Sequence, residues 1–371
     1  MTPGGIAALV AGGGFAIAFV FGYVGAKANF CTMGALSDVV NMGHWGRLRM
    51  WLLAVAVAII GATALSFFGV VDLSASVTQR PVLPWLSLFV GGFAFGVGMT
   101  LSGGCANKNL IRAGGGSVRS MVVLTFAAIA AYMTLKGLFG HWRATFLDPV
   151  NINLGERGWP DQSLATILAR SAGMDHKTAL IGTACVVAAA LLIFVFKDRR
   201  FRANRLQVGA GVILGALVVA GWYVSGHLGY GENPETLETV YFATNTRTIE
   251  SLSFIAPLAY SLELLMRWTD VSLQFTFGIA SVIGVIAGSA VHGLTSKTFR
   301  WEGFASVHDL RNQLSGGVLM GFGGVTALGC TIGQGISGLS TLAIGSFIAT
   351  GAIVAGSVAT LKYTLWKAER E

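Results

Sequence analysis

The chain has 371 residues, of which 54% are hydrophobic and only 11% are charged, and its formal net charge is +8. Because soluble proteins carry about 25% charged residues, this chain cannot cover a water-facing surface with ionised side chains. The composition therefore excludes an ordinary soluble protein and indicates a polytopic membrane protein. Most Lys and Arg residues fall in short segments between apolar runs, where such residues set membrane orientation, so we expect no nucleic-acid binding.

Apolar runs separated by short polar segments predict about nine transmembrane helices. The first run has no positively charged segment ahead of it, so we expect it to be retained as a span rather than cleaved. The basic segments lie on one side if the N-terminus is outside the cell membrane and the C-terminus is in the cytoplasm. The expected spans cover residues 5–26, 48–70, 82–101, 119–139, 178–196, 206–226, 272–294, 314–329 and 340–362.

The Gly-rich stretch Gly91–Ser117 is repeated in Gly316–Ser340 at a constant offset of 225 residues. In both copies an apolar helix runs into a Gly-Cys pair and then a polar, glycine-broken turn. Six matched positions in so short a window are hard to obtain by chance, so the match predicts an internal repeat. The matched positions are Gly91 with Gly316, Gly92 with Gly317, Gly96 with Gly321, Gly98 with Gly323, Gly104 with Gly329 and Cys105 with Cys330.

The two copies of the repeat have opposite directions, because the third expected span runs inward and the eighth runs outward. We therefore expect an all-α, single-domain membrane protein with short re-entrant helices and two inverted repeats of four spans, arranged 4+1+4. The first repeat is placed at residues 1–139, the second at 206–371, and the linking helix with a basic cytoplasmic loop at 178–205. A weaker match, at an offset of 224, predicts a short or re-entrant helix at 251–268 and puts Ile255 opposite Cys31.

Three cysteines lie where an apolar helix gives way to small and polar residues: Cys31 in NFCTMG, Cys105 in LSGGCANKN and Cys330 in LGCTIGQG. A helix N-terminus buried at such a break has unpaired N–H groups and attracts an anion. Thiols add weak donors on soft, polarisable side chains, which suit an anion with a soft sulfur surface. The remaining candidate substrate-binding residues are Asn29, Thr32, Gly104, Asn109, Gly329, Thr331 and Gln334.

Plainer roles stand beside these. A lone membrane cysteine usually packs as a small hydrophobe, and this is the role we assign to Cys185, which has no break beside it. The polar residues at the breaks can equally serve to satisfy backbone groups. Lys108 and Arg112 fit the role of ordinary orientation residues, and Glu263 can pair with Arg267 four residues on. No HExxH, Cys/His cluster or phosphate loop occurs, so we expect no metal, no cofactor and no catalytic residue.

With NFCTMGALSD, SGGCANKNLIRAGGGSVRS and GCTIGQGISG, the sequence resembles the YeeE/YedE sulfur-transport family of bacterial inner-membrane proteins over both halves of the chain. The resemblance implies a transporter, not an enzyme, that takes thiosulfate or a related sulfur anion into the cytoplasm. It also implies that Cys31, Cys105 and Cys330 pass the anion along by S–H hydrogen bonds. Other sulfur or selenium species stay open as substrates, and a cytoplasmic sulfur-carrier protein is a candidate partner besides membrane lipid.

Two rival classes remain. A membrane thiol protein that exchanges disulfides or transfers sulfane sulfur would use the same cysteines, although the chain has no CxxC motif. A structural membrane subunit would need none of them. The sequence also leaves open whether transport occurs by a channel, by proton symport or by handover to a carrier.

Overall fold

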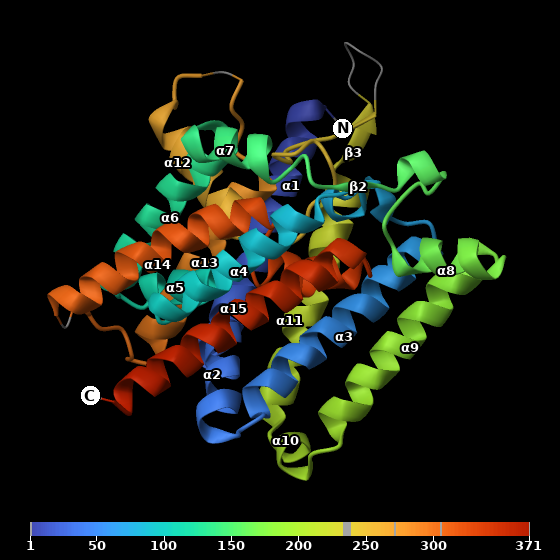
Figure 1. Ribbon diagram of the computed structural model, residues 1–371. Helices are drawn as coiled ribbons and strands as arrows, with labels where there is room; N and C mark the ends of the chain where they lie inside the picture. Colours follow the sequence, from blue (N-terminus) through green and yellow to red (C-terminus); the bar gives the residue numbers. More distant parts are fainter. Residues whose placement is uncertain (1, 233–238, 271, 305, 371) are drawn as a thin grey trace.

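The computed structural model describes residues 2–232, 239–270, 272–304 and 306–370, and it is almost entirely helical (Figure 1). The helices are α1 (Pro3–Lys27), α2 (Thr32–Met42), α3 (Gly46–Phe67), α4 (Trp85–Leu101), α5 (Ala106–Gly114), α6 (Val118–Lys136), α7 (Leu138–Phe146), α8 (Leu164–Ala172), α9 (His176–Phe196), α10 (Arg199–Ala203), α11 (Arg205–Tyr223), α12 (Ile255–Met266), α13 (Phe277–Thr295), α14 (Val307–Thr326) and α15 (Ile344–Ala368). Short 3₁₀ turns are η1 (Leu73–Ala75), η2 (Val77–Gln79) and η3 (Gly155–Arg157), and π-helical turns are η4 (Val224–Leu228) and η5 (Gly333–Gly338).

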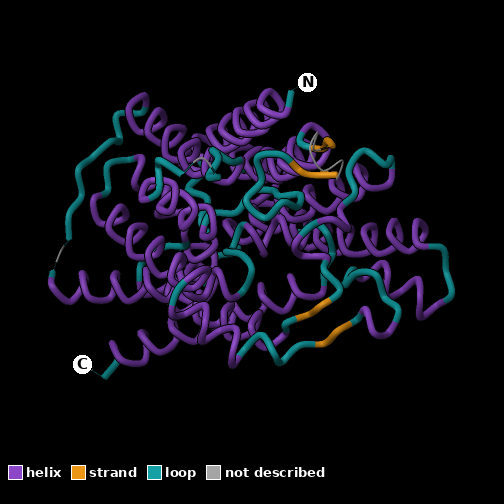
Figure 2. The backbone as a smooth tube through the Cα atoms, turned by 90° about the horizontal axis from the view of Figure 1, so that it is seen from above, coloured by secondary structure: helices purple, strands orange, loops and turns teal. Residues whose placement is uncertain are grey.

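The strands of the described residues form two short antiparallel pairs in the connecting segments (Figure 2). β1 (Val82–Leu83) pairs with β2 (Ile152–Asn153), and β3 (Tyr230–Glu232) pairs with β4 (Thr239–Tyr241). Pairs of two or three residues are too short to stand alone, so they fasten loops onto the helical bundle.

The bundle has two ends, which we name by the termini they carry (Figure 1). The N-face carries the N-terminus, α7, α8 and the strands. The C-face carries the C-terminus, α10 and the connections at residues 43–45, 115–117 and 296–304. The basic segment from Lys197 to Arg205 lies on the C-face, as does the connection around Arg47.

In the described part of the chain, eight helical segments are long and apolar enough to cross a membrane, which confirms a polytopic all-α membrane protein. The expected span at 314–329 corresponds to α14 and is not among the eight segments. The first turns of α14 contain His308, Asp309 and Arg311, so the apolar part of this helix is too short to count as a span. The short helix expected at 251–268 is α12, with 12 residues. Its N-cap is Phe254, whereas the N-cap of α2 is Cys31, so the two helix starts are related by one residue less than the offset of 224 that put Ile255 opposite Cys31.

The core is built on glycines that let helix backbones touch. A β-carbon on Gly98 would lie 2.7 Å from the carbonyl oxygen of Gly316, and one on Gly316 would lie 2.7 Å from that of Gly98. A β-carbon on Gly323 would lie 2.5 Å from the oxygen of Gly91. The offset of 225 residues maps Gly91 onto Gly316 and Gly98 onto Gly323, so the contact between Gly98 and Gly316 corresponds to the contact between Gly323 and Gly91. The helices α4 and α14 therefore cross as an antiparallel, pseudo-symmetric pair.

The outer contacts of the two crossing helices obey the same symmetry. Gly96 of α4 lies against α15, where a β-carbon would be 2.2 Å from the oxygen of Ile353. Its counterpart Gly321 of α14 lies against α6, where a β-carbon would be 2.3 Å from the oxygen of Ala127. Close packing by small residues therefore holds the two broken helices in a fixed crossing at the centre of the molecule.

Candidate functional site

The three buried cysteines follow one type of helix-ending turn. In each case the helix ends on a residue with left-handed φ, the next N–H reaches back five residues, and the cysteine comes two residues after the left-handed residue. The left-handed residues are Asn29 (φ 52°), Gly103 (φ 67°) and Leu328 (φ 56°). The closing bonds join Phe30 N–H to Gly25 O (2.9 Å), Gly104 N–H to Met99 O (2.9 Å) and Gly329 N–H to Gly324 O (2.8 Å).

A new helical segment begins directly after Cys31 and Cys105, and three residues after Cys330. Cys31 is the N-cap of α2, and its Sγ accepts a hydrogen bond from the Gly34 N–H at 3.2 Å. Cys105 is the N-cap of α5. The Sγ of Cys330 accepts from the Gly333 N–H at 3.5 Å, where η5 begins. The sulfurs thus occupy the positive ends of helical segments, where spare N–H groups favour negative charge.

The fold brings the three cysteines together. The Cys31 and Cys105 thiols are direct neighbours, and the Thr331 hydroxyl lies beside the Cys105 sulfur. Cys330 faces the backbone N–H of Phe254, which starts α12, so a fourth helix N-terminus joins the cluster. The exposed fraction is 5% for Cys31 and 0% for both other cysteines, and all three are free thiols. Cys185, by contrast, is exposed on α9.

Two predicted polar residues lie next to this cluster. Thr32 is buried, its backbone N–H faces the Cys105 sulfur, and its hydroxyl has no hydrogen-bond partner among the described residues. Asn29 is exposed, and its Oδ1 accepts a hydrogen bond from Lys108 Nζ at 2.5 Å. An unpaired buried hydroxyl is costly in a protein interior, so Thr32 has spare capacity for a ligand oxygen.

The amides of Asn109 and Gln334, which match under the repeat, hold the turns in shape. Asn109 Nδ2 donates to Gly104 O at 2.9 Å, and Gln334 Nε2 donates to Ala327 O at 2.9 Å. Gln334 Oε1 also accepts from Ser346 Oγ at 2.7 Å. In this structure both side chains satisfy backbone groups, and their direct contact with a substrate stays a prediction.

The glycines just before two of the cysteines leave little space around the turns. A β-carbon on Gly104 would lie 3.2 Å from Lys108 Cγ, and one on Gly329 would lie 3.0 Å from Gln334 Cγ. These distances are tighter than ordinary van der Waals contact. Glycine at both positions therefore lets a neighbouring side chain fold back over the turn.

A cavity of about 280 Å³ opens on the N-face and reaches the residues around Cys330. Its lining includes Arg80 from a connecting segment, Arg143 from α7, Glu250, and Gly333 near the buried Cys330 thiol. Arg80 is exposed, whereas Arg143 pairs with Asp148 at 3.1 Å. Burial raises the pKa of the Glu250 carboxyl, against the opposing effect of hydrogen bonds from Thr246. The cavity can therefore become more positive when Glu250 is protonated.

The residues lining this cavity were not found from the sequence, since Arg80 and Arg143 lie outside the matched stretches Gly91–Ser117 and Gly316–Ser340. Asn107 and Trp51 are among the other described residues that have buried polar atoms without a hydrogen-bond partner. Asn107 lies two residues after Cys105 in the motif LSGGCANKN, so its position in the sequence could have identified it as a candidate. Trp51 packs against Gly335 of η5, where a β-carbon would lie 2.7 Å from the indole ring, and no local pattern marked it.

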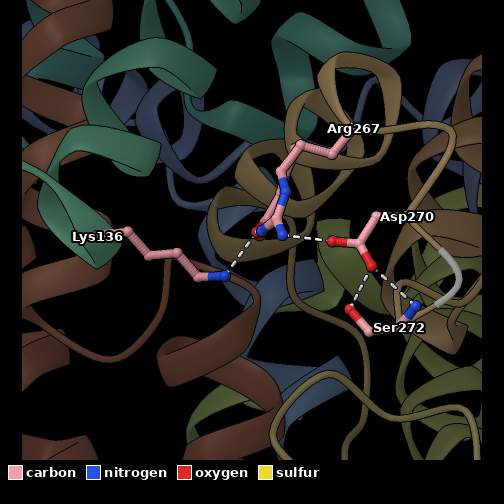
Figure 3. A network of polar contacts seen from close by, with 5 residues as sticks. Lys136, Arg267, Asp270 and Ser272 are labelled. Atoms are coloured by element: carbon pink, nitrogen blue, oxygen red, sulfur yellow. Dashed lines mark hydrogen bonds and ion pairs between the residues drawn. The ribbon is translucent and has the colours of Figure 1, made fainter.

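An ionic network on the N-face joins α6 to α12 (Figure 3). The Glu263 carboxylate, with 3% of its side chain exposed, accepts from Lys136 Nζ at 2.5 Å and from Arg267 Nη1 at 3.2 Å. Arg267 also pairs with Asp270, which accepts from Ser272. The pair expected between Glu263 and Arg267 is confirmed, and the additional partner Lys136 fastens the far end of α12.

Comparison with known proteins agrees with this architecture. The family model described as "Sulphur transport" matches residues 27–359. The thiosulfate transporter TsuA of Escherichia coli is 26% identical over 329 residues, which cover 85% of this chain and 84% of the relative. TsuA of Spirochaeta thermophila is 24% identical over 354 residues, which cover 93% and 96%. Since the family model covers most of the chain, including all three buried cysteines, this membrane protein belongs to the Sulphur transport family.

Proposed function

We propose that the chain imports thiosulfate, or a closely related sulfur anion, across the bacterial inner membrane through a passage lined by Cys330, Cys105 and Cys31. Two relatives that align with most of the chain are named thiosulfate transporters. The observation that carries the proposal is the direct grouping of three buried thiols at helix N-termini. No other described cluster combines anion-attracting N–H groups with soft donors.

The order of the thiols follows from their surroundings. Leu328 and Gly333, on either side of Cys330 in the chain, line the cavity on the N-face. Cys105 is fully buried, and Cys31 is followed by α2, which leads to the C-face. Thiosulfate has a soft terminal sulfur and three hydrated oxygens. A chain of S–H donors can take the soft end in turn, while backbone N–H groups replace part of the hydration shell.

The positive charges support the orientation. Because the basic segment from Lys197 to Arg205 lies on the C-face, that face would be cytoplasmic and the N-face periplasmic. The two inverted halves would comprise residues 1–139 and 206–371, with residues 178–205 as the link. A sulfur-carrier protein in the cytoplasm would then receive the anion at the C-face.

The test is thiosulfate uptake in a sulfur-requiring bacterial strain and in proteoliposomes. Cys105→Ala and Cys330→Ala should lose uptake while folded protein remains in the membrane. Cys185→Ala is the matched control, since this thiol is exposed on α9 and should be dispensable. Normal uptake by Cys105→Ala or Cys330→Ala would refute passage along the thiols.

A thiol protein that transfers sulfane sulfur is the second candidate, favoured by one observation. The Cys31 and Cys105 thiols are direct neighbours, which is what exchange between two cysteines requires. Intact-protein mass spectrometry after turnover separates the two functions. A persulfide or mixed disulfide on Cys31 or Cys105 supports transfer, whereas unmodified thiols throughout turnover support transport.

A further inference from the structure

Four charged side chains gather on the C-face side of the thiol cluster. Asp38 of α2 binds Arg47 through two hydrogen bonds, 2.5 and 2.6 Å long, and the Asp38 carboxylate is almost fully buried. Within the described ranges of the chain, the hydrogen-bond partners of Lys108 and Arg112 of α5 are neutral. Lys108 donates to Asn29 Oδ1, and Arg112 Nη1 donates to Gly103 O at 2.9 Å. One carboxylate therefore neutralises one of three cations.

These groups are close to the thiols. Lys108 lies within electrostatic range of Cys31, Cys105, Arg112 and Arg47. Lys108 and Arg112 both fold over Gly104, where a β-carbon would be 3.2 Å from Lys108 Cγ and 3.5 Å from Arg112 Nη1. The cations thus cover the turn that presents the Cys105 thiol, and both are half-buried rather than fully solvated.

Arg47 approaches from the other side of the cluster. Its Nη1 would be 2.5 Å from a β-carbon on Gly34. The N–H of that same glycine donates to the Cys31 sulfur at 3.2 Å. The Arg47 guanidinium therefore lies one helical turn from the Cys31 thiol. Among the described residues, its hydrogen-bond partner is the Asp38 carboxylate.

We propose that Lys108 and Arg112 form an inner binding site for the oxygens of a sulfonate- or sulfate-type dianion, and that Asp38 keeps this site weak by masking Arg47. The inference rests on the proposed function and adds a place where the anion pauses after Cys31. The amide and carbonyl oxygens now bound to Lys108 and Arg112 are neutral acceptors, which an anion can displace. A third unmasked cation would hold a dianion too firmly for release, and conduction needs binding that is weak enough to leave.

The experiment compares binding and turnover in purified and reconstituted variants. Asp38→Asn should lower the Kd for thiosulfate by about tenfold, as expected for one unmasked cation near a dianion, and should lower kcat and KM together. Arg112→Gln should raise Kd instead. Sulfate serves as a second probe, since it has the same charge but a fourth oxygen in place of the soft terminal sulfur.

Controls separate charge masking from a purely structural ion pair. The double variant Asp38→Asn/Arg47→Gln should recover kcat relative to Asp38→Asn, because it removes the unmasked cation. If Asp38→Asn is folded and its Kd is unchanged or higher, the inference is wrong. If that variant does not fold, an unchanged Kd in Arg112→Gln overturns it. Cys105→Ala tests the proposed passage itself. If Cys105→Ala loses uptake but the Kd of Asp38→Asn is not lowered, only the inner binding site is refuted.

Discussion

The crossing of α4 on α15 leaves no room for a side chain at Gly96, so Gly96→Ala should destabilise the protein. The new β-carbon would lie 2.2 Å from Ile353 O and 2.8 Å from Ser357 N, both backbone atoms that cannot rotate away. Ordinary contact begins at 3.4 Å, so α15 must retreat by more than 1 Å. Overpacking of this kind costs about 1–3 kcal/mol, against a gain of about 0.5–1 kcal/mol in helix propensity.

We therefore expect a net loss of about 1–2 kcal/mol in the free energy of unfolding, or roughly 2–8 °C in Tm on the scale of domains of 150–250 residues. Thermal unfolding of detergent-purified protein measures it. Gly351→Ala in α15 is the matched control, since no atom lies within 4 Å of its β-carbon position, and its Tm should stay equal or rise. Gly321→Ala should behave like Gly96→Ala. Equal Tm values for Gly96→Ala and the control would refute backbone contact at this crossing.

Three further changes test the site and its supports. Burial raises the pKa of Glu250, and its protonation removes a negative charge from the cavity, so the Kd for thiosulfate should fall as the pH falls toward that pKa. Glu250→Gln should bind thiosulfate tightly without this pH dependence. A pH dependence that persists in the variant contradicts this role. Asn109→Leu deletes the hydrogen bond to Gly104 O and leaves this buried carbonyl with one partner fewer. Tm should therefore fall by the equivalent of about 1–3 kcal/mol, and uptake should fall with it. An unchanged Tm would show that the turn keeps its shape without the amide. Glu263→Ala frees Lys136 and Arg267, both about half exposed and able to regain water, so calorimetry should show a modest loss of about 1 kcal/mol; a loss of 3–5 kcal/mol would mean that the network behaves as a buried one.

Much of the fold could be predicted from the sequence because its signals are local or periodic. Apolar runs marked the spans, and the spacing of Gly91, Gly98 and Cys105 against their counterparts revealed two opposed broken helices. The structure shows what that spacing does, since the same glycines form the crossing of α4 and α14. The short helix α12 was also expected from the weaker match, although its N-cap is Phe254.

What the sequence could not reveal depends on long-range contacts or on side-chain direction. Lys136 meets Glu263 only because α6 and α12 end side by side on the N-face, a fact that no local pattern carries. Arg80, from a connecting segment, and Arg143, from α7, reach one cavity although they are 63 residues apart in the chain. For Asn109 and Gln334 the sequence left contact with the anion and support of the backbone both open, because it does not say which way an amide points; here both donate to backbone carbonyls.

The four helix starts at the centre do not all carry sulfur. Three present a thiol, whereas the fourth, at α12, presents Phe254, whose ring is fully buried. In the proposed arrangement of two antiparallel copies, the backbone would have no preferred direction of transport, so a difference between the two ends of the passage would come from side chains. Phe254 takes the place of a thiol at one of the four helix starts. In the proposed passage, a row of sulfurs that is incomplete on that side would make the two directions of transport chemically distinct.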